Sequence, residues 1–110
     1  VVRPRHMRCA AVLALALFAL GACKGDPVEC EKACRNHATL KYWEKVDAEI
    51  AALPEDQQAA ARADKEAKLE GELEQGMGFC VASCRSADND GQTACLIAAK
   101  TAAEAQACVD

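Results

Sequence analysis

In the segments CEKAC (residues 30–34) and CVASC (residues 80–84), two cysteines are separated by three residues. Cysteines four positions apart lie on the same face of an α-helix, one turn above the other. In an antiparallel helical hairpin, facing residues have position numbers with a constant sum. Pairing the outer cysteines and the inner cysteines gives the same sum, 114. The segments therefore predict two disulfides between antiparallel helices: Cys30–Cys84 and Cys34–Cys80.

The turn of this hairpin is expected near the midpoint between the two cysteine pairs. The turn signal there is Leu53-Pro54-Glu55-Asp56, because proline ends a helix and acidic residues suit the first turn of the next one. A first helix is predicted from about Pro27, which suits a first helical turn, to Leu53. A second helix is predicted from after Pro54 to about Ser86.

Each predicted helix has an apolar stripe with a spacing of three or four residues. The first stripe comprises Cys30, Ala33, Cys34, His37, Leu40, Trp43, Val46, Ile50 and Leu53. The second comprises Ala59, Ala63, Leu69, Leu73, Met77, Cys80 and Cys84. The same register places Gly71 opposite Trp43, where the missing side chain would leave room for the ring, and His37 opposite Met77.

The C-terminal part of the chain carries the third pair of cysteines. Residues 88–91 (DNDG) predict a turn, and the alanine-rich residues 92–110 predict helix. Cys95 and Cys108 would lie about 19.5 Å apart along one unbroken helix, too far for a disulfide. Residues 101–104 (TAAE), however, match a capping box, which predicts a second helix start. We therefore favour two short helices that fold back and form a Cys95–Cys108 disulfide; a continuous helix would instead crosslink both cysteines to the hairpin.

The N-terminal residues have the pattern of a secretory signal peptide. An uncharged apolar run at residues 10–20 follows three arginines, Arg3, Arg5 and Arg8. Such a run is shorter than the roughly 20 residues that span a bilayer as a helix, and it fits a signal-peptide core. We expect residues 1–22 to be removed.

The segment Leu20-Gly21-Ala22-Cys23 resembles the lipobox of bacterial lipoproteins. This resemblance implies cleavage before Cys23 and attachment of acyl chains, palmitate among them, to Cys23. In that class, Asp directly after the lipidated cysteine retains the protein in the inner membrane. Here the residue is Lys24, which implies the outer membrane, facing the periplasm. The alternative is an ordinary signal peptide with Cys23 in a disulfide.

The composition that would remain after processing favours covalent stabilisation. The chain has 17 acidic and 13 basic residues; removal of the three leader arginines leaves ten basic residues and a net charge of −7. An acidic surface argues against nucleic acid as a partner. Alanine dominates the apolar residues, and so small a domain gains little from burial alone. We therefore expect a lipidated tether at residues 23–29 and one all-α domain at residues 30–110: a disulfide-stapled antiparallel hairpin followed by one or two short helices.

The residues that could carry chemistry are few. Four cysteines could hold zinc or act as a redox pair, but export into an oxidising compartment favours disulfides. His37 and Met77 could together ligate a metal ion, although a packed histidine beside a space-filling methionine is the more common arrangement. No nucleophile–base pair or phosphate-binding loop is apparent. We expect no cofactor and no enzymatic activity.

The twin C-x3-C pattern resembles the small chaperones of the mitochondrial intermembrane space, whose two helices are joined by two nested disulfides. The likeness covers only the four hairpin cysteines, and the 45 residues between the pairs are more than that family has, so it implies a fold and no function.

The chain as a whole resembles the small Cys-rich lipoproteins of diderm bacteria, a class without an assigned activity. The expected function is a structural or protein-interaction module, held to a membrane by its lipid, with an envelope protein as partner through Tyr42 or apolar residues near the turn; the alternative is a metal or thiol-redox carrier. The sequence identifies no small-molecule ligand.

Overall fold

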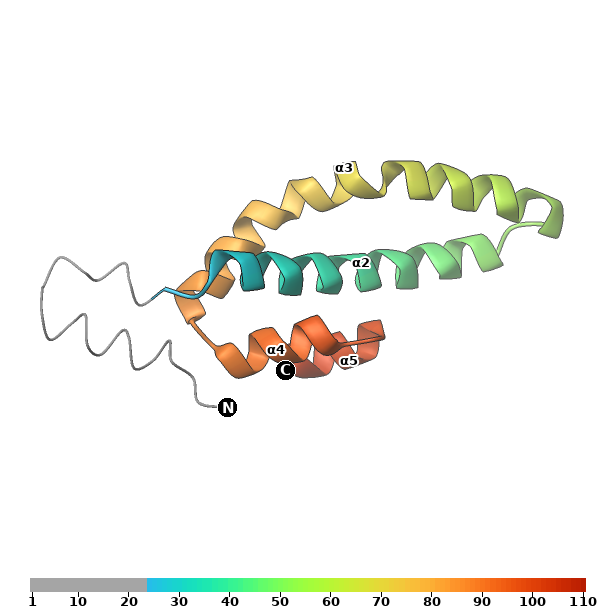
Figure 1. Ribbon diagram of the computed structural model, residues 1–110. Coiled ribbons are helices and arrows are strands. Elements are labelled where there is room, and N and C mark those ends of the chain that lie inside the picture. The colour runs from blue at the N-terminus through green and yellow to red at the C-terminus, as the bar shows by residue number, and fades with distance from the viewer. Residues whose placement is uncertain (1–23) are drawn as a thin grey trace, which may run out of the picture.

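The computed structural model describes residues 24–110, so the predicted signal peptide and Cys23 lie outside the described residues. The chain forms α2 (Pro27–Ala51), α3 (Glu55–Ala87), α4 (Asp90–Ala98) and α5 (Ala102–Val109). No strand occurs in the described part, which confirms the predicted all-α class. Figure 1 shows α2 and α3 as an antiparallel hairpin, with α4 and α5 on the opposite side of α2. The central helix α2 therefore contacts all the others.

Local signals account for where the two long helices begin and end. The Asp26 carboxylate accepts a hydrogen bond of 2.8 Å from the Val28 amide at the start of α2, and Pro27 occupies the first turn. The helix ends at Ala51, two residues before the predicted Leu53. At the other end of the hairpin, Asp88 adopts the left-handed conformation with φ of 45° and ends α3, a conformation that aspartate tolerates better than most residues.

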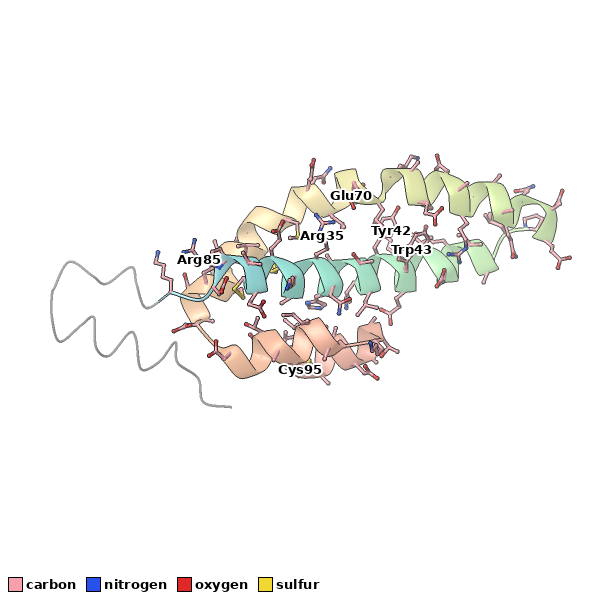
Figure 2. The ribbon with its side chains drawn as sticks, in the orientation of Figure 1. Arg35, Tyr42, Trp43, Glu70, Arg85 and Cys95 are labelled. Atoms are coloured by element: carbon pink, nitrogen blue, oxygen red, sulfur yellow. A yellow bond between two sulfur atoms is a disulfide. The ribbon has the colours of Figure 1, made fainter. Side chains whose placement is uncertain are left out.

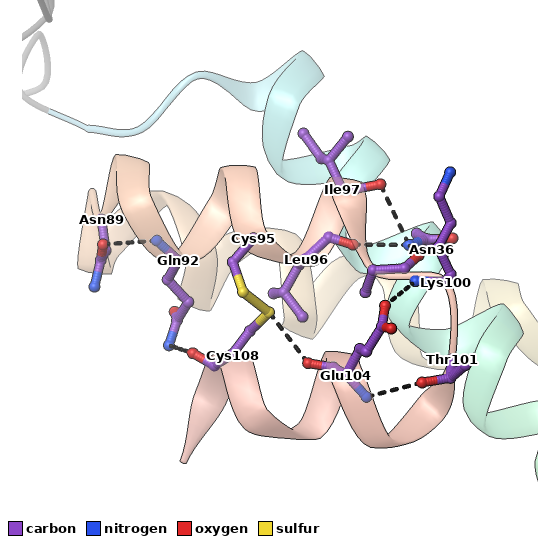
Figure 3. Close-up of a disulfide and its surroundings, with 11 residues drawn as sticks. Asn36, Asn89, Gln92, Cys95, Leu96, Ile97, Lys100, Thr101, Glu104 and Cys108 are labelled. Atoms are coloured by element: carbon purple, nitrogen blue, oxygen red, sulfur yellow. Dashed lines mark hydrogen bonds between the residues drawn. A yellow bond between two sulfur atoms is a disulfide. The ribbon is translucent and has the colours of Figure 1, made fainter.

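The C-terminal tail breaks into two helices, as the capping signal predicted. The Thr101 hydroxyl accepts a hydrogen bond of 3.1 Å from the Glu104 amide, and the Glu104 carboxylate accepts one of 2.7 Å from the Lys100 amide (Figure 3). In an ideal capping box the carboxylate would reach the amide of the cap residue itself; here it reaches one residue further back. The fold-back brings Cys95 and Cys108 to a Cα–Cα distance of 5.8 Å, and a disulfide joins them.

The core is small and lies between α2 and the C-terminal helices. Ala33 and Ala105 are fully buried and form a cluster with Leu96 and Ala99. The side-chain amide of Asn36 donates hydrogen bonds to the carbonyls of Leu96 (2.7 Å) and Ala99 (2.9 Å). These carbonyls are at the end of α4, where a helix has no internal donors left to satisfy them. Asn36 thus fixes α4 on α2 at a position 60 residues away in sequence.

In the half of the hairpin nearer the turn, α2 buries Val46 and Ile50, but the predicted stripe of α3 is wrong there. Ala59 and Ala63 are exposed, and in α3 only Leu73 is buried. The side chains that reach α2 there belong to Arg62, which pairs with Asp47, and to Lys65, which lies 3.4 Å from the Glu49 carboxylate. These partly exposed ion pairs flank the buried Val46 and Ile50, while Ala59 and Ala63 face solvent.

Gly71 does not lie under Trp43, contrary to the prediction. It is exposed, and a Cβ added to it would meet nothing within 4 Å. The guanidinium carbon of Arg62 lies 5.0 Å from the centre of the Trp43 ring instead, an attractive cation–π arrangement. The arginine approaches the ring from a different turn of α3, so the extrapolated hairpin register does not hold this far from the disulfides.

Candidate functional site

Two disulfides close the open end of the hairpin in the predicted pairing. Cys30 and Cys84 are joined with an S–S distance of 2.06 Å, and Cys34 and Cys80 with one of 2.03 Å. The two cysteines of α2 are each 2% exposed. These four residues are therefore bonded to each other and offer no free thiolate to a metal ion.

An apolar groove of about 380 Å³ lies between α3 and the C-terminal helices, with α2 as its floor. Ala33, Cys34 and His37 form the floor, and Thr93 and Leu96 of α4 form one wall. The other wall is the last part of α3, from Phe79 to Ala87, and Val109 closes the side near the C-terminus. The groove exists because α4 and α5 pack on α2 and leave a gap beside α3.

Phe79 is the most prominent side chain of this groove. It lines the groove and is 82% exposed, more than Val28 (58%), Val109 (38%) or Leu53 (36%). The sequence analysis did not single out Phe79. The available signal was a large apolar residue at a position outside the predicted apolar stripe of α3. A large exposed apolar side chain beside an apolar hollow commonly marks an interaction site.

His37 and Met77 lie in one pocket, as their predicted shared layer requires. This second pocket of about 290 Å³ lies between α2 and α3 and adjoins the groove, since Cys34, His37 and Cys80 line both. Among residues 24–110, no group of three or more His, Cys, Asp or Glu side chains is placed to hold a metal ion. Of these residue types, Glu72 and the disulfide-bonded Cys34 and Cys80 also line the pocket.

Burial lowers the pKa of His37 below its ordinary value, and the positive charge of Lys41 lowers it further. The folded protein thus binds a proton at His37 less readily than the unfolded chain, whose histidine keeps a pKa of about 6.5. A depressed pKa of a base favours folding above the unfolded pKa, and this contribution is lost as the pH falls through 6.5 toward the folded value.

Acidification from about pH 7.5 to about pH 5.5 is therefore expected to lower the free energy of unfolding through His37. In the His37→Gln variant this part of the pH dependence should disappear, because glutamine does not titrate. Urea unfolding of both proteins at the two pH values measures the difference. An equal or steeper decrease in the variant would contradict this role for His37.

Tyr42, a predicted contact residue, is integrated into the hairpin. Its hydroxyl donates a hydrogen bond of 2.6 Å to the Lys65 carbonyl, and its ring makes an edge contact with Trp43 at a centroid distance of 5.4 Å. Figure 2 shows both side chains between α2 and α3, with the Arg35–Glu70 ion pair nearer the disulfides. Tyr42 is partly exposed, and its role as a contact residue stays a prediction.

The chain enters the fold at the stapled end of the hairpin. The Gly25 amide donates a hydrogen bond of 2.8 Å to the Arg85 carbonyl, and the Arg85 side chain donates one of 3.1 Å to the Gly25 carbonyl. A Cβ at Gly25 would lie 3.2 Å from the Arg85 Cα, so this close approach favours glycine. Gly25 is thereby held at the stapled end of the hairpin.

None of the helices in residues 24–110 is both long and apolar enough to cross a membrane. No protein-family model matches the chain, and no curated protein or solved structure is significantly similar to it.

Proposed function

We propose that this protein is a non-enzymatic, lipid-anchored helical spacer of the bacterial envelope. In this proposal residues 1–22 are removed, Cys23 carries the acyl chains, and the helices extend from the outer membrane into the periplasm. Six cysteines in three disulfides support an oxidising compartment. Two acylations of one residue would be sufficient for stable anchoring.

The observation that carries the proposal is the contact between Gly25 and Arg85. Cys23 precedes Gly25 by two residues, and Gly25 is held against the end of α3 beside Cys84. A lipid on Cys23 would therefore lie at the stapled end. The turn after Ala51 would lie at the opposite end of a 25-residue helix, about 37 Å away.

This geometry favours a spacer that presents its charged end to another envelope protein. Surface ion pairs such as Asp47–Arg62 lie near the turn, and α4 and α5 do not extend that far along α2 (Figure 1). An acidic chain of this kind would not be drawn to anionic lipid headgroups, so the turn would stay away from the membrane.

The alternative, a metal or thiol-redox carrier, would require the hairpin cysteines as free thiols. Thiol counting on the unreduced, denatured protein distinguishes the two functions. The spacer predicts no reactive thiol among the six cysteines of the helical domain, and the carrier predicts four.

Replacing Cys23 by serine tests the anchor. Cells expressing the wild-type protein or the Cys23→Ser variant would be fed an alkyne analogue of palmitate and fractionated. We expect the wild-type protein to be labelled and found with the outer membrane, and the variant to lose the label and to leave the membrane fraction. The Cys9→Ser variant is the matched control, since it also replaces a cysteine by serine, but within the leader, and should keep the label. Unchanged labelling of Cys23→Ser would contradict the proposed anchor.

A further inference from the structure

We infer that the groove beside Phe79 binds a second copy of this chain. In the resulting dimer, Phe79 of each copy would be inserted into the groove of the other. The interface would lie at the stapled end of the hairpin and leave the end with the turn free.

One face of the molecule carries both a projecting ring and a hollow for it. Phe79 is 82% exposed, and it lies on the edge of an apolar groove of about 380 Å³. A phenylalanine side chain can bury about 150–250 Å². A two-fold dimer brings the same surface of both copies together, so it requires a surface that is complementary to itself. The ring and its neighbouring hollow meet this requirement, because each copy supplies one ring and accepts one.

The surface around Phe79 and the groove carries no formally charged side chain. Residues 75–84 of α3 contain no charged side chain, and among the groove-lining residues only His37 can titrate. Residues 24–110 otherwise carry an excess of acidic groups. A neutral surface on an acidic protein offers no attraction to a basic partner, but it allows two acidic copies to approach without strong repulsion.

The α3 backbone beside Phe79 is open to the approach of a neighbouring helix. Gly76 and Gly78 precede it in α3 by three residues and by one, and both are exposed, with nothing within 4 Å of an added Cβ. A neighbouring helix could therefore approach the α3 backbone closely beside the ring.

The hairpin register gives the orientation of the two copies. The disulfides match Cys34 with Cys80, so Phe79 lies at the height of the groove floor, between Cys34 and His37. Ring and hollow thus share one level along the hairpin, and a two-fold axis parallel to the helices keeps them matched. Both stapled ends would then lie side by side. This orientation agrees with two copies anchored in one membrane. Only that agreement rests on the proposed lipid anchor.

Photocrosslinking of the full chain in cells tests the pairing. A benzophenone analogue of phenylalanine would replace Phe79, and the cells would be irradiated. We expect a covalent adduct of twice the protein mass, with the crosslink mapped to groove residues such as Thr93 or Leu96. The same analogue at Leu53, an exposed residue at the turn, is the control and should give no such adduct. The absence of a dimer adduct, or adducts only with lipid or with another protein, would overturn the inference.

Sedimentation of the purified full-length protein in detergent provides a second measurement. The Phe79→Ala variant should weaken dimerisation at least tenfold without changing the free energy of unfolding of the monomer, because the side chain is exposed in the single chain. The Leu53→Ala variant should remain as dimeric as the wild type. A wild-type monomer, or a Phe79→Ala dimer of unchanged affinity, would contradict the inference.

The Cys23→Ser variant separates failure of the pairing from failure of the anchor. It should still form the Phe79-dependent dimer in solution, since the groove and the ring are unchanged. A dimer adduct without acyl labelling of the wild type would refute only the anchor. Labelling without any dimer adduct would refute only the pairing.

Discussion

Simultaneous replacement of Cys30, Cys34, Cys80 and Cys84 by alanine is expected to abolish stable folding at 37 °C. The disulfides close segments of 54 and 46 residues, and a bridge over a segment of this size stabilises by about 4 kcal/mol in the chain-entropy account. The buried residues cannot replace that contribution, because most of them are alanine or cysteine. The larger buried apolar residues are Val46, Ile50, Leu73 and Leu96. Far-UV circular dichroism against temperature measures the loss.

Removal of the inner disulfide alone should cost less stability than removal of both. With Cys30–Cys84 in place, the Cys34–Cys80 bridge closes only a short additional ring, so its separate entropic contribution is smaller, about 2–3 kcal/mol. The Cys34→Ala/Cys80→Ala variant is therefore expected to melt at a lower temperature but to remain folded at 25 °C. A four-alanine variant that melts within a few degrees of the wild type would contradict the structural role of the disulfides.

The Leu96→Ala variant is expected to lose about 2–5 kcal/mol and to release α4 and α5 from the hairpin. Leu96 is 7% exposed and is the largest residue in the cluster of Ala33, Ala99 and Ala105. Its truncation leaves a hollow that the neighbouring alanines are too small to fill. Native-state hydrogen exchange should show faster exchange in residues 90–109, while the amides of α2 near the disulfides stay protected.

The matched control for this variant is Leu53→Ala. Leu53 is 36% exposed, and a substitution at such a surface position usually changes stability by less than about 0.5 kcal/mol. Equal losses from Leu96→Ala and Leu53→Ala would contradict the assignment of Leu96 to the core.

The stapled part of the fold could be predicted from sequence because covalent geometry is restrictive. Two cysteines one helical turn apart can bond to two others in only a few arrangements, and the position of Pro54 agrees with one of them. The break at Thr101 was likewise predictable, because a capping box acts within four residues. Both signals are local or bounded by bond lengths.

The half of the hairpin near the turn could not be predicted in the same way. Extrapolating the register from the disulfides assumed straight helices at constant separation. The structure instead places Arg62 over Trp43 and leaves Gly71 open to solvent. Long charged side chains cross between the helices there beside the buried Val46 and Ile50, and a pattern of apolar residues does not report how such side chains extend.

The groove depended on a contact that the pattern does not encode. Ala33 was assigned to the face of α2 toward α3, yet it forms the core with α4 and α5. The docking of α4 depends on the Asn36 amide and carbonyls 60 and 63 residues away. The packing of α4 on α2 forms the groove wall opposite Phe79. The groove therefore could not be predicted from the position of Phe79 in the sequence.

Disulfide mapping of the unreduced protein tests the central claim most directly. Trypsin can cleave after Lys32, which separates Cys30 from Cys34. Thermolysin can cleave before Val81, which separates Cys80 from Cys84. The account predicts one linked peptide pair with Cys30 and Cys84 and another with Cys34 and Cys80. A link between Cys30 and Cys34, or four unbonded sulfurs in this set, would contradict the stapled hairpin.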